Sequence, residues 1–156
     1  MVSATLLAAA ATATLSGSYD CTFEHQGMVT ETGIQASAEV NFVGADREHW
    51  RFNFRASQAN DGTQSIQVNW PSDPIQIAGT HAALDIAPGH LVFIATAPPP
   101  CMLTETNCVA LVQVSARPDG GAAFTILPAG AGGDDAHGRT QMHVIFTGSC
   151  RRQNGS

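Results

Sequence analysis

The sequence contains no lysine, and charged residues of any kind are scarce. Only 13% of its 156 residues are charged, and every cation is one of seven arginines. The formal net charge is −6, and like charges adjoin only at Asp134–Asp135 and at Arg151–Arg152. Nucleic-acid binding needs a concentrated basic surface, and attraction to anionic lipid needs a polybasic segment. The sequence therefore predicts neither kind of partner.

The short motifs of common catalytic and metal sites are also missing. There is no His-x-His, His-Glu-x-x-His, Cys-x-x-Cys or Gly-x-Ser-x-Gly. The nearest cluster is Asp134, Asp135 and His137, and it lies in a glycine-rich segment, residues 129–139, that we expect to be a flexible, solvated loop. We assign no catalytic residue, metal or cofactor. A secreted hydrolase or metal-dependent enzyme that uses this segment is an alternative.

Long apolar runs are absent apart from the N-terminal stretch MVSATLLAAAATATL. Its apolar part has the length of an export signal, and Ala11-Thr12-Ala13 is a small-x-small cleavage pattern, so residues 1–13 are predicted to be a signal peptide. An alanine-rich helix packed on the domain is the alternative. A membrane span takes about 20 apolar residues. We therefore expect an exported protein, periplasmic or extracellular, without a transmembrane segment.

What the sequence does contain is a recurring alternation of apolar and polar residues, the pattern of half-buried β-strands. The clearest cases are IQASAEVNF at residues 34–42 and WRFNFRA at residues 50–56. Turn signals such as Asp-Gly at 61–62 and Pro-Gly at 88–89 separate the strands. We predict one all-β domain over residues 14–156, an antiparallel β-barrel or β-sandwich of about eight or nine strands.

Four cysteines in a chain predicted to be exported favour disulfide bonds. Cys21 shares its strand phase with Tyr19 and Phe23, and Cys150 shares its phase with Phe146. Both cysteines should therefore point into the core, one from the first strand and one from the last. First and last strands are neighbours in many closed β folds, so we predict a Cys21–Cys150 disulfide.

Cys101 and Cys108 would then close a small loop after the run of three prolines. A zinc knuckle requires two closely spaced pairs of ligands, and a thioredoxin-type couple requires two intervening residues. This chain has one pair with six residues between its members, which favours a second structural disulfide. A rigid loop of this kind also suits a small secreted enzyme inhibitor, a further alternative for the function.

The strongest apolar feature is an aromatic stripe that includes Trp50, Phe52, Phe54 and Trp70. Such residues form an ordinary core, or they line a ligand cavity, which an eight-stranded barrel is just wide enough to hold. Our leading hypothesis is an exported, disulfide-stapled, non-enzymatic β-domain of the cell envelope. It would bind a small apolar ligand or an envelope protein.

Overall fold

A computed structural model describes residues 15–30, 33–38, 50–73, 75–97, 108–129 and 143–153. These residues contain nine β-strands and no helix. In chain order the strands are β1 (Gly17–Thr30), β2 (Gly33–Ala38), β3 (Arg51–Gln58), β4 (Gln64–Asn69), β5 (Gly79–Ala87), β6 (His90–Ala97), β7 (Cys108–Ala116), β8 (Ala122–Ala129) and β9 (His143–Arg152).

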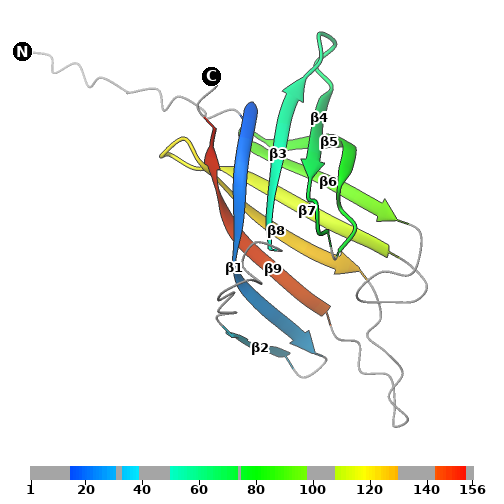
Figure 1. The fold of residues 1–156 in the computed structure, drawn as a ribbon, viewed down its shortest axis with the longest axis vertical. Coiled ribbons are helices and arrows are strands. Elements are labelled where there is room, and N and C mark those ends of the chain that lie inside the picture. The colour runs from blue at the N-terminus through cyan, green and yellow to red at the C-terminus, as the bar shows by residue number, and fades with distance from the viewer. Residues whose placement is uncertain are drawn as a thin grey trace, which may run out of the picture.

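The sheet closes into an antiparallel barrel. Each strand from β3 to β9 pairs with the next, and β1 pairs with both β3 and β9, so eight strands complete the circle. Figure 1 shows β9 running back along β1, with its end beside the start of β1. The all-β prediction is confirmed, and of the two architectures it is the barrel.

Strand alternation explains where the core lies. Along β3 the side chains of Phe52, Phe54 and Ala56 are buried, and the residues between them are partly or fully exposed. On β4, Ile66 and Val68 are buried in the same way. These are the positions that the period-two pattern assigns to the interior. Apolar burial of this kind is the main favourable term in folding.

The long first strand serves two neighbours in succession. Its first half, Gly17 to Thr22, pairs with β3, whereas its second half, from Gln26 onward, pairs with β2. Between them the register against β9 shifts at Phe23–His25, a β-bulge. A bulge bends a strand and increases its twist, and it marks the point where β1 leaves β3 for β2.

Three short connections join strands at one end of the barrel: residues 59–63, 88–89 and 117–121. Gly62 and Gly89 adopt positive φ there, a conformation that glycine reaches without steric cost. The Asp-Gly and Pro-Gly signals of the sequence are thus confirmed as turns. The connection between β4 and β5 lies at the opposite end. There, Asp73 Oδ1 accepts hydrogen bonds from the backbone N–H groups of Ile75 and Gln76.

Several predictions concern residues outside the described ranges. They are the signal peptide at 1–13, Cys101 and the cluster of Asp134, Asp135 and His137. β8 extends to Ala129, and residues 130–139 of the expected glycine-rich loop also lie outside the described ranges. Within the described ranges no helix is long and apolar enough to cross a membrane.

Candidate functional site

A disulfide bond joins the first and last strands of the barrel. Cys21 of β1 and Cys150 of β9 are directly opposite each other in the ladder, with Cα atoms 4.0 Å apart, and their sulfurs are bonded. The two residues are only 1% and 3% exposed, as their strand phase predicted. The prediction of a Cys21–Cys150 bond is confirmed. The bond fixes the seam at which the barrel closes.

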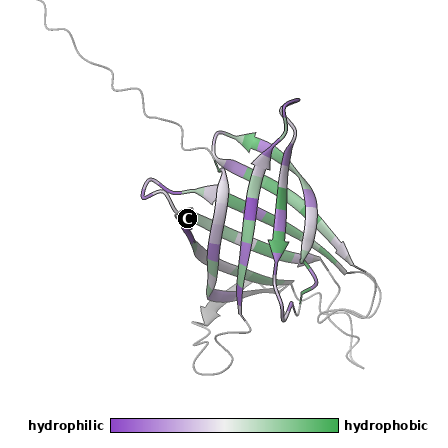
Figure 2. Cartoon of the chain, turned by 45° about the horizontal axis from the view of Figure 1, so that its top comes forward, coloured by the Kyte–Doolittle hydropathy of each residue, from purple (hydrophilic) through white to green (hydrophobic). Residues whose placement is uncertain are grey.

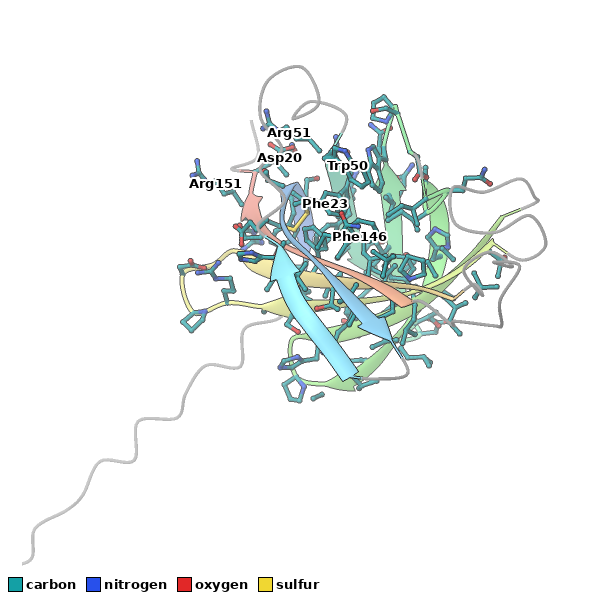
Figure 3. All side chains as sticks on the ribbon, turned by 90° about the horizontal axis from the view of Figure 1, so that it is seen from below. Asp20, Phe23, Trp50, Arg51, Phe146 and Arg151 are labelled. Atoms are coloured by element: carbon teal, nitrogen blue, oxygen red, sulfur yellow. A yellow bond between two sulfur atoms is a disulfide. The ribbon has the colours of Figure 1, made fainter. Side chains whose placement is uncertain are left out.

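The barrel interior holds a cluster of aromatic rings. Phe23 is its centre and contacts five others with centroid distances of 5.0–5.8 Å: Trp50, Phe52, Trp70, Phe124 and Phe146. Figure 3 shows Phe23, Trp50 and Phe146 lying together. Edge-to-face contacts of this kind add to the stability that burial already provides.

The four residues proposed to line a ligand cavity belong to this interior. Phe52, Phe54 and Trp70 are buried, and Trp50 is partly buried against the core. Phe54 stacks on Tyr19 with ring centroids 4.8 Å apart. The alternation rule placed all four correctly on the inner side of the sheet. Their role as the lining of a ligand site stays a prediction.

The outer side of the barrel divides into two unlike surfaces. β6, β7 and β8 contain no Asp, Glu, Lys or Arg at all, so three consecutive strands carry no formal charge from acids, lysines or arginines. Colouring by hydropathy shows long hydrophobic stretches on these strands, whereas β3 alternates (Figure 2). We call the uncharged outward side chains of β5–β9 the neutral face, of which Asp85 on β5 and Arg151 on β9 are not part. Its large apolar members are Leu84, Ile86, Val92, Ile94, Val109, Leu111, Leu127 and Ile145.

Register makes the neutral face continuous. Leu84 is opposite Val92, Ile94 is opposite Leu111, and Leu111 is opposite Leu127. Leu84, Ile86 and Ile94 are 71%, 58% and 59% exposed. Scattered exposed leucines are normal in soluble proteins, but a contiguous apolar patch marks an interaction site. The neutral face is therefore a candidate protein-binding surface.

The opposite outer surface, on β1, β3 and β4, is polar and charged. Asp20 and Glu24 extend from β1 and Arg51 and Arg55 from β3, and all four are exposed. Figure 3 shows Asp20, Arg51 and Arg151 gathered on the outside of the barrel. Glu24 accepts a hydrogen bond from Ser149 Oγ, and Asp20 accepts one from Gln153 Nε2. This surface is well solvated.

Two of the described histidines, His81 and His90, make hydrogen bonds within the barrel. His81 Nε2 is hydrogen-bonded to the carbonyl oxygen of Ile77 at 2.8 Å, and its ring stacks on Phe93. His90 Nδ1 is hydrogen-bonded to Ser115 Oγ at 2.8 Å. In the part of the chain that the structure describes, no three His, Cys, Asp or Glu residues gather closely enough to hold a metal ion.

The neutral face was not predicted from the sequence, although one segment of the sequence carries a pattern that indicates it. The segment CVALVQVSA is apolar on both faces at its start, a pattern typical of a strand covered on both sides. The structure pairs this strand, β7, on both edges, yet Leu111 remains 39% exposed.

Comparison with known proteins finds no matching family model, no significantly similar curated sequence and no significantly similar solved structure.

Proposed function

We propose that this chain is an exported, non-enzymatic binding module of the cell envelope that docks a protein through the neutral face. The carrying observation is the contiguous apolar surface of β5–β9, in which three aliphatic side chains are more than half exposed. Burying apolar surface stabilises a complex by about 25 cal/mol per Å² before the costs of association are subtracted.

The disulfide supports the compartment in this proposal. Disulfide bonds persist in oxidising compartments and are rare in the cytosol. Cys21 and Cys150 are buried and paired, and they are positioned by the ladder between β1 and β9. A periplasmic or extracellular location provides the oxidising chemistry that this bond needs.

We assign a second copy of the chain as the occupant of the neutral face. Each copy carries a formal net charge of −6, and like-charged molecules repel unless they meet across a surface that lacks the shared sign. β6–β8 are such a surface. A two-fold axis would place the same apolar residues opposite each other, which is the self-complementarity that an isologous dimer needs.

The size of the face fits this occupant. One partner can face about three strands of an eight-stranded barrel, and three strands about 4.8 Å apart, each about eight residues of about 3.3 Å, present roughly 400 Å² before side chains add to it. A stable interface takes about 800 Å² from each partner. The two areas are of the same order, so two neutral faces suffice for a modest dimer.

Sedimentation velocity of the purified protein tests the proposal. We expect the wild-type chain to sediment as a dimer at micromolar concentration and Ile94→Glu to sediment as a monomer. Gln58→Glu adds the same charge to an exposed position on β3 and should remain dimeric. Thermal unfolding of all three proteins checks that each is folded.

A wild-type chain that stays monomeric up to millimolar concentration would overturn the second-copy assignment. Flotation with neutral phosphatidylcholine vesicles tests whether a lipid surface, rather than a second copy of the chain, occupies the neutral face. Vesicle binding that Ile94→Glu abolishes, without any dimer, would identify the neutral face as a membrane-contacting surface instead and would contradict the proposal.

A further inference from the structure

A groove of about 330 Å³ lies on the polar outer surface, away from the neutral face. Its volume is at the lower end of the range for small-molecule sites. Hydrogen-bonding side chains line it from β1, β3, β4 and the residue that follows β9: Ser18, Asn53, Arg55, Gln67, Asn69 and Gln153.

The ladder fixes the relative positions of these side chains. Arg55 is opposite Ser18 on one side and opposite Gln67 on the other. In the next row of the same face, Asn53 is opposite Asn69. Directly opposite residues have Cβ atoms about 5 Å apart. The sheet therefore fixes the backbone positions of these polar groups, whereas the exposed side chains of Arg55, Gln67 and Asn69 are ordered only when a ligand binds.

Gln153 lies beside these side chains because β9 pairs with β1. Its backbone N–H donates to the carbonyl oxygen of Ser18 at 2.8 Å, and its side-chain amide donates to Asp20 Oδ1 at 2.8 Å. The second bond engages the carboxylate of Asp20, which is opposite Asn53 in the pair of residues next to Ser18 and Arg55 on the same face of the sheet.

The charge of the groove is opposite to that of the chain. Among the residues that the structure describes, no acidic side chain lines it, although the sequence has 13 acidic residues and only seven cations. Arg55 forms no ion pair within the described residues, where the ion pair that does occur is Arg117–Asp119 in a turn. Arg51 lies on the same face of β3, four residues before Arg55. Arg151 of β9 is opposite Asp20 of β1.

We propose that this groove binds an acidic sugar, a hydroxyl-rich ring that carries one carboxylate. The planar guanidinium of Arg55 matches a carboxylate through two parallel hydrogen bonds. The amides of Asn53, Gln67 and Asn69 each offer donors and an acceptor, and the Ser18 hydroxyl offers both. Sugar hydroxyls require such partners, whereas a simple inorganic anion would use only the donors.

This inference is independent of docking through the neutral face, because the groove lies on β1, β3 and β4. Either proposal can fail without the other. The Ile94→Glu variant should keep sugar binding, and variants of the groove should leave the oligomeric state unchanged.

NMR titration of the ¹⁵N-labelled protein with glucuronate tests the inference. We expect saturable shifts at Ser18, at Arg55 Nε and at the Gln67 side-chain amide. Arg55→Gln should weaken binding by at least about tenfold, the loss that follows from removing a charge-assisted hydrogen bond. Arg117→Gln removes an arginine from a turn outside the groove and should bind as the wild type does.

Three ligands complete the design. Glucose, which lacks the carboxylate, and acetate, which lacks the hydroxyls, should each bind at least about tenfold more weakly than glucuronate. An oligomer of uronic acids that binds more tightly than the monosaccharide would assign the groove to a polysaccharide, and equal affinity would assign it to the free sugar. Absence of saturable shifts, equal affinity for acetate, or unchanged binding by Arg55→Gln would overturn the proposal.

Discussion

Phe23 and Phe124 lie on strands that both pair with Gly148 of β9, and their rings meet edge to face with centroids 5.0 Å apart. The missing side chain at position 148 makes this contact possible. A Cβ atom there would clash with the backbone carbonyl oxygen of Thr22 and would stand 2.6 Å from two ring carbons of Phe124, closer than real Cβ contacts. The glycine thus lets two strands bring their aromatic rings together across a third.

Gly148→Ala is expected to destabilise the barrel by at least about 1–3 kcal/mol, the usual cost of overpacking a core. Urea unfolding followed by tryptophan fluorescence measures the change. Gly27→Ala is the matched control on the neighbouring strand, since its added Cβ would come no closer than 4.0 Å to the Cβ of Ile145. Equal unfolding midpoints for the two variants would contradict the packing described for Phe124.

Gly148 and its neighbours show which features of the fold the sequence alone can predict and which it cannot. Alternation correctly oriented Cys150 and Phe146 toward the core because side-chain direction has period two in any strand. The role of the glycine depends on which strands flank β9, and one of them, β1, lies more than a hundred positions away in the sequence. Local pattern carries no information about it.

The two candidate surfaces were hidden for related reasons. Ser18 and Arg55 meet in the β1–β3 ladder, and Gln153 joins them only because the barrel closes between β1 and β9. The neutral face was not predicted because a strand that is apolar on both sides, such as β7, is usually covered on both sides. Whether a covering layer exists depends on the tertiary fold.

Asp73 organises the connection between β4 and β5. Its Oδ1 accepts from the N–H groups of Ile75 and Gln76, and its Oδ2 accepts from the N–H of Ala78 at 2.5 Å. Gln76 has a φ of 62°, which is uncommon for a non-glycine residue and is held by this network.

Asp73→Ala removes all three hydrogen bonds and is expected to lower the free energy of unfolding by about 2–4 kcal/mol, because hydrogen bonds to charged groups contribute about 1.5–3 kcal/mol each and are not additive. Asp73→Asn keeps one carbonyl oxygen and should lose less. Urea unfolding ranks the variants. The network has no stabilising role if Asp73→Ala unfolds at the wild-type midpoint.

The turn between β3 and β4 makes stability depend on pH. The backbone N–H of Thr63 donates to Asp61 Oδ1 at 2.9 Å, and this bond, with a contribution from the Thr63 side chain, lowers the pKa of Asp61. A carboxylate whose pKa is lower in the folded state stabilises that state above its unfolded value. The contribution disappears as the pH falls through the folded pKa.

We therefore expect NMR titration to give Asp61 a midpoint below the ordinary aspartate value of 3.8. Asp61→Ala should be less stable than wild type near neutral pH, and the difference should shrink in acid. A midpoint at or above the ordinary value would show that the Thr63 bonds are not formed in solution.

The bond between the first and last strands should contribute strongly to stability. Cys21 and Cys150 are separated by 129 positions, and closing a loop of that length stabilises the folded state by up to about 5 kcal/mol in the chain-entropy account. The Cys21→Ser, Cys150→Ser double variant should unfold at much lower urea concentration than the wild type. Adding reductant should lower the stability of the wild type more than that of the variant, which keeps only the predicted Cys101–Cys108 bond. A double variant as stable as wild type would show that the bond adds nothing.

An oxidised Cys21–Cys150 bond closes the eight-stranded barrel, and we propose that the protein carrying this bond is exported. Mass spectrometry of peptides from unreduced protein, isolated from its native host, tests it most directly. We expect one crosslinked species that joins the peptides containing Cys21 and Cys150. Free thiols at these positions, or Cys21 crosslinked to Cys101 or Cys108, would contradict the account.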